Sequence, residues 1–146
     1  MITDIFKYFS SKTTLGNIYY FADKVNGHFV IKQGAEDYKL FPLEENYGFV
    51  YINSKEYNKL GINEKYFMTF YYFYESTNDD KITKLQDIEK NLNILKQKAD
   101  GFQLLKSNIN NDEILQDFIH ENIAGSSERK MIKVEFYLLI GKGDCV

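Results

Sequence analysis

One segment, residues 65–76 (KYFMTFYYFYES), packs seven aromatic rings into twelve positions. A strand places alternate side chains on opposite faces, so Phe67, Tyr71 and Phe73 share one face. The opposite face carries Tyr66, Met68, Phe70, Tyr72 and Tyr74. A strand that faces water on one side carries polar residues there, and this segment has almost none before Glu75. Both faces therefore need a cover, and a small chain must find two separate ones.

The composition bounds the size and the partners of the protein. The chain is long enough to bury one core, and we expect a single domain over residues 1–146. Its net charge of −3 gives no general attraction for nucleic acid or for acidic membranes. Among its basic residues only Arg129 is an arginine, the side chain that reads guanine and phosphate bidentately. We therefore expect no specific nucleic acid and no membrane as a partner, and no stretch is apolar enough to span a bilayer.

The first half of the chain reads as one short helix followed by β-rich sequence. Thr3 or Asp4 can cap the helix. Asn26-Gly27, between two apolar runs, is the dipeptide most typical of a two-residue β-hairpin turn. The expected elements are a helix at 3–10, strands at 18–25, 28–33, 37–43 and 47–54, and a loop at 54–64.

The second half reads as two helices followed by a strand. Apolar residues recur at steps of three or four from Ile82 to Phe102, which predicts one long amphipathic helix. Polar residues at 76–80 supply its start signal. The remaining expected elements are a shorter helix at 112–123, a strand at 131–140, and a flexible or partner-bound tail at 141–146.

This order predicts an α+β fold, a mainly antiparallel β-sheet with its helices packed on one face. The long helix can cover one face of the aromatic strand at 65–76. The other face is left to the N-terminal helix or to another subunit, because large exposed apolar surfaces usually mark interaction sites.

No pattern of residues predicts catalysis or cofactor binding. His28 and His120 lack the spacing of metal ligands, and Cys145 lies next to the last residue, with no base beside it. Neighbouring carboxylates such as Glu44 and Glu45 point opposite ways on a strand, so they do not form a general acid–base couple. We therefore expect no catalytic, metal or cofactor site, and a protein that is not an enzyme.

The order of elements resembles tail terminator and tail-completion (neck) proteins of tailed bacteriophages, and the related caps of contractile injection systems. The segments that carry the resemblance are IFKYFS at 5–10, KLFPLEENYGFVYI at 39–52, the aromatic strand, the expected helix at 82–107, and MIKVEFYLLIGKGDCV at 131–146. The resemblance implies a structural virion protein that forms a ring, commonly a hexamer, at the head-proximal end of the tail. Its partners would be copies of itself and other tail or neck proteins, assembled in the bacterial host cytoplasm.

A ring requires contacts between subunits, so we expect the functional residues to be interface residues. Tyr72 and Tyr74 combine apolar area with a polar tip, which suits an interface. Lys133 and Glu135, on the polar half of the last strand, can set the register between subunits or form an ordinary solvent-facing surface.

Two other classes of function fit the same sequence. One is a small acidic immunity-type or inhibitor protein that blocks a basic partner through Glu36-Asp37, Glu44-Glu45 and Asp79-Asp80. The other is an enzyme or ligand carrier with an aromatic cavity lined by Tyr71, Tyr72 or Tyr74. An inhibitor is expected to be a monomer or dimer that forms a one-to-one complex, which distinguishes it from a ring. An enzyme or ligand carrier is expected to have a concave cavity.

Overall fold

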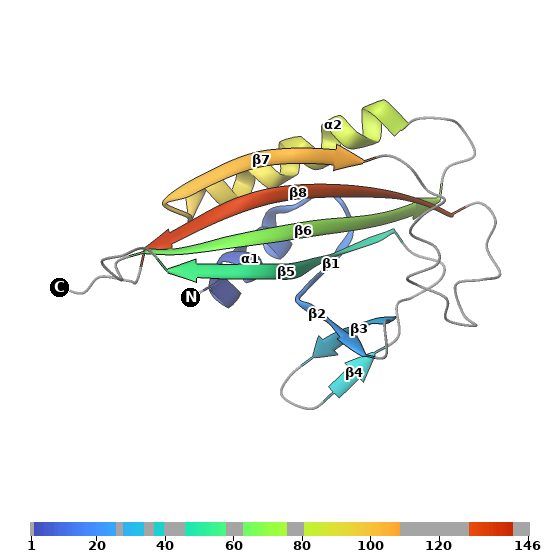
Figure 1. The fold of residues 1–146 in the computed structure, drawn as a ribbon. Coiled ribbons are helices and arrows are strands. Elements are labelled where there is room, and N and C mark those ends of the chain that lie inside the picture. Colours follow the sequence, from blue (N-terminus) through green and yellow to red (C-terminus); the bar gives the residue numbers. More distant parts are fainter. Residues whose placement is uncertain are drawn as a thin grey trace.

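The computed structural model describes residues 2–25, 28–33, 37–39, 46–57, 63–75, 81–108 and 129–141. In chain order the elements are α1 (Ile2–Lys12), β1 (Asn17–Tyr20), β2 (Ala22–Val25), β3 (His28–Gln33), β4 (Asp37–Lys39), β5 (Tyr47–Tyr57), β6 (Asn63–Glu75), α2 (Lys81–Leu92), the 3₁₀ helix η1 (Asn93–Gln97), β7 (Gly101–Asn108) and β8 (Arg129–Gly141). Five strands form the main sheet in the order β1-β5-β6-β8-β7, and β2-β3-β4 form a smaller sheet beside its β1–β5 edge (Figure 1). Only β1 and β5 pair in parallel within the main sheet, so the predicted α+β fold with a mainly antiparallel sheet is confirmed.

The aromatic strand, β6, is the centre of the main sheet. It pairs antiparallel with β5 on one side and with β8 on the other. Its even-numbered residues face the helices and its odd-numbered residues face away from them, as the alternation predicts. From Met68 to Tyr74 every side chain of β6 is buried, so both faces of this strand are core over most of its length.

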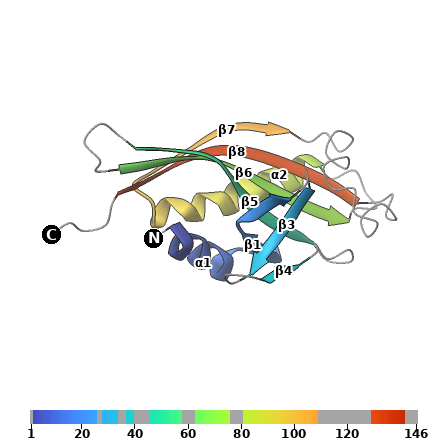
Figure 2. The same ribbon diagram turned by 60° about the horizontal axis from the view of Figure 1, so that its bottom comes forward.

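Both described helices cover the same face of the sheet (Figure 2). Phe6 and Phe9 of α1 share one core with Leu92 of α2 and Leu95 of η1. The Phe9 ring meets the β6 ring of Phe70 edge-on, with 6.0 Å between the centroids. The prediction of helices on one face is confirmed, and the suggestion that the N-terminal helix covers the second face of β6 is wrong.

A buried asparagine ties the two helices together. Asn91 of α2 is 5% exposed, and its Oδ1 accepts hydrogen bonds from the Thr14 backbone N–H at 2.9 Å and the Thr13 hydroxyl at 3.0 Å. Its Nδ2 donates to the Asp87 carbonyl at 2.8 Å. The turn after α1 is thereby fixed to α2, because a buried amide is costly unless its polar atoms are bonded.

Phe21 marks the point where the chain leaves the main sheet. Its φ of 69° lies in the left-handed region, which is rare for a bulky residue. The Phe21 ring packs edge-on against Phe6, with 5.5 Å between the centroids, on the helix side. The next residue, Ala22, is buried on the opposite face of the sheet. The expected single strand at 18–25 is therefore two strands in two sheets.

Two boundaries differ from the prediction. The helix predicted from Ile82 to Phe102 ends at Leu92, continues as η1, and is followed by β7 at 101–108. Phe102 and Leu104 pack on the core while Gln103 between them is exposed, so a period of two replaces the helical period there. Residues 54–57 and 63–64 of the predicted loop at 54–64 are strand instead, since β5 continues to Tyr57 and β6 begins at Asn63, and residues 58–62 lie outside the described residues.

Several predictions fall outside the described residues. These are the Asn26-Gly27 turn, residues 40–43 of the strand expected at 37–43, the helix start at 76–80, the helix at 112–123, and residues 142–146 of the tail. Val25 and His28, the residues on either side of Asn26-Gly27, are antiparallel partners in β2 and β3.

Replacing Asn91 with alanine tests the connection between α1 and α2. Because Asn91→Ala leaves the Thr14 N–H without its acceptor, we expect the free energy of unfolding to fall by about 1–3 kcal/mol. Asn93→Ala is the matched control: the exposed Asn93 makes the same side-chain bond to the carbonyl four residues back, and its loss should cost no more than about 0.5 kcal/mol. Equal losses in urea denaturation would contradict the role of Asn91.

Candidate interaction surface

The face of the main sheet that points away from the helices, here called the outer face, is divided into two halves. In the half near β2, Tyr47 and Phe49 of β5 stack on Phe73 and Tyr71 of β6, each pair with 5.0 Å between ring centroids. These four rings form a core with Ala22 and Met131. The rings are at most 7% exposed, so this half is covered from within the chain.

The other half of the outer face holds a shallow groove, here called the outer groove. It has a volume of about 300 Å³ and is lined by Lys65, Gly101, Phe102, Gln103, Tyr137 and Leu139. Phe67 lies beside it, with its ring centroid 5.4 Å from that of Tyr137. Phe67, Tyr137 and Leu139 are all half-buried. This half of the sheet therefore presents apolar surface that the covered half does not.

Three features of the sequence build the groove. Gly101 faces Leu139 across the strand pair, and a Cβ on Gly101 would lie 3.1 Å from the Leu139 Cβ. The missing side chain keeps the floor open and lets β7 approach β8 closely. Lys65 lies over the Tyr137 ring, with 4.1 Å from its Nζ to the centroid, so a cation is held at the rim. An apolar floor with one cation and one amide, Gln103, suits an apolar group without positive charge.

The edge strand β7, and β5 where it extends past the short edge strand β1, carry devices that oppose further strand pairing. β5 has a one-residue bulge at Asn53, and β7 has one at Leu105. Exposed lysines follow them, Lys55 and Lys106. Bulges and edge lysines are common protections against edge-to-edge association. The outer face, and not an edge, is therefore the better candidate for contact with another molecule.

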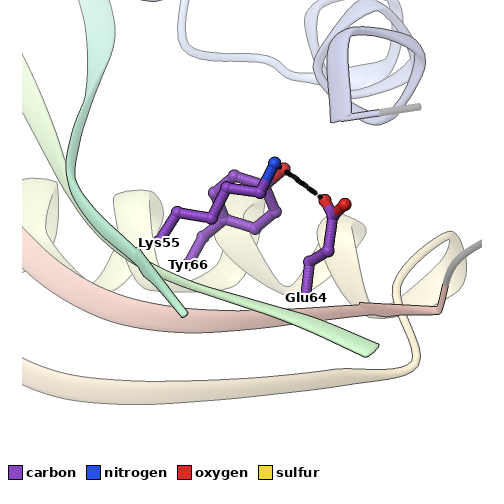
Figure 3. Close-up of polar contacts among 3 residues, drawn as sticks. All are labelled: Lys55, Glu64 and Tyr66. Atoms are coloured by element: carbon purple, nitrogen blue, oxygen red, sulfur yellow. Dashed lines mark hydrogen bonds and ion pairs between the residues drawn. The ribbon is translucent and has the colours of Figure 1, made fainter. Parts of the chain in front are cut away.

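A polar cluster lies at the end of the β5–β6 pair, on the helix side of the sheet (Figure 3). The Tyr66 hydroxyl donates to the Glu64 carboxylate at 2.6 Å, and the Lys55 Nζ lies 3.4 Å from the same carboxylate. Burial, and then the hydrogen bond to Glu64, raise the pKa of Tyr66. The hydrogen bond to Tyr57 is the largest of the effects that raise the pKa of Lys55. The raised pKa values favour the neutral phenol of Tyr66 and the charged amine of Lys55.

The predicted interface residues separate into two pairs. Tyr72 and Tyr74 are each 1% exposed and lie under the helices, so they are core residues and their assignment to a surface is wrong. The Tyr72 hydroxyl donates to the Leu15 carbonyl at 2.5 Å, and burial raises the pKa of Tyr72 to about 12. Lys133 and Glu135 do lie on the outer face, half-buried, and form an ion pair at 3.7 Å beside the groove.

Sequence reasoning missed the outer groove itself. One signal was present, because the polar face of the strand at 131–140 gives way to Tyr137 and Leu139 near its end. The β7 side of the groove gave no such signal, because Gly101 and Gln103 fall in the segment that was predicted to be helical. The aromatic cavity expected at Tyr71, Tyr72 or Tyr74 does not coincide with this groove, whose lining contains none of the three.

Only some of the other predicted features lie among the residues that the structure describes. His28 begins β3, whereas His120 and Cys145 lie outside the described residues. The acidic pairs at 36–37, 44–45 and 79–80 lie outside them too, apart from Asp37 at the start of β4. Within the described ranges no group of three or more potential metal ligands comes together. No helix in the same ranges has the length and apolar character needed to cross a membrane.

Comparison with known proteins gives no family for the chain. No protein-family model matches it, and no curated protein matches it significantly.

The raised pKa of Tyr72 predicts a loss of stability at high pH. The folded state favours the neutral phenol, so its contribution is fully present below pH 10 and is lost as the pH rises toward 12. We expect Tyr72→Phe to lower the free energy of unfolding by about 1 kcal/mol at pH 8, through loss of the bond to Leu15. The variant should also lose less stability than the wild type between pH 10 and 12. Parallel pH profiles for the two proteins, measured by urea denaturation, would contradict this role.

Proposed function

We propose that this protein is a non-enzymatic structural subunit that forms a ring at the head-proximal end of a phage-type tail. The observation that carries the proposal is the outer groove, an apolar surface left on a sheet whose other half is closed. Half-buried Phe67, Tyr137 and Leu139 form this surface. Apolar side chains that stay partly exposed together on one face suit a contact with another protein.

The protected edges favour assembly through the face of the sheet. Bulges at Asn53, where β5 extends past β1, and at Leu105 of the edge strand β7 oppose the addition of a strand at these two places. A contact between the outer face of one copy and a different surface of the next is heterologous, and such contacts form rings when the rotation closes. A ring requires no chemistry from the subunit, only a surface that repeats.

The arrangement of the elements supports the same proposal. A short N-terminal helix, β-rich sequence, a long aromatic strand leading into α2, and a C-terminal strand returning to the sheet follow one another in that order. This is the order on which the resemblance to tail terminator proteins depends, except that the helix expected at 82–107 is replaced by α2, η1 and an additional strand, β7. The ring would end growth of the tail tube and present a surface to the neck of the particle.

Native mass across a concentration series tests the proposal, with negative-stain imaging of any large species and of added tail tubes. We expect a ring, or a climb in mass toward one, and capped tube ends. Phe67→Lys places a charge on the apolar half of the outer face, so it should hold the protein at lower mass. Asn93→Lys, at an exposed site on η1, adds the same charge and should assemble like the wild type. A wild-type monomer that leaves tail tubes uncapped would contradict the proposal.

A further inference from the structure

We draw no further inference here: the strongest candidate, the outer groove lined by Lys65, Tyr137 and Leu139 on the open half of the outer face, carries none because nothing in the structure shows what covers it.

Discussion

The structure depends on the packing of β6 between two covers. Phe70, Tyr72 and Tyr74 point into the core under α1 and α2, while Tyr71 and Phe73 stack against β5 on the outer face. A central strand with aromatic rings on both faces cannot leave either face in water. Other elements of the chain must therefore bury both faces of β6. The helices bury the centre of one face. The second face is closed only near β2, and this unequal cover produces the surface on which the proposed function rests.

The unequal cover also connects stability with assembly. The helix side is fixed by the bonds of Asn91 to the turn after α1 and by the bond of the Tyr72 hydroxyl to Leu15, so it has little freedom to open. The outer groove lies on the same rigid sheet, and its floor comes from β8 and the close approach of Gly101. A preformed groove loses little conformational entropy on binding, which suits the repeating contact that the proposed function requires. Bulges at Asn53 and Leu105 disfavour strand addition beside them, which is consistent with the association through the outer face that is proposed above.

The sequence predicted an element correctly where its apolar residues followed a single period, either that of a strand or that of a helix. The alternation in β6 and β8 located both strands and assigned their faces, because a period of two over ten or more residues has no helical equivalent. The reading failed where two periods overlap: Leu95, Ala99 and Phe102 continue a helical stripe, while Phe102 and Leu104 already alternate as β7. The interface assignment of Tyr72 and Tyr74 failed for a related reason. Residue type marks a tyrosine as suited to an interface, but only the placement of both helices on one face showed that these two are buried.

The central claim is that the open half of the outer face becomes buried between subunits. Hydroxyl-radical footprinting, read by mass spectrometry on dilute and on assembled protein, measures this directly for Phe67, Tyr137 and Leu139 side chains that are half-buried in the monomer. Lower oxidation of Phe67, Tyr137 and Leu139 in the assembled protein, with Tyr8 of α1 unchanged, is the predicted result. Assembly that leaves the oxidation of Tyr137 and Leu139 unchanged would contradict the claim.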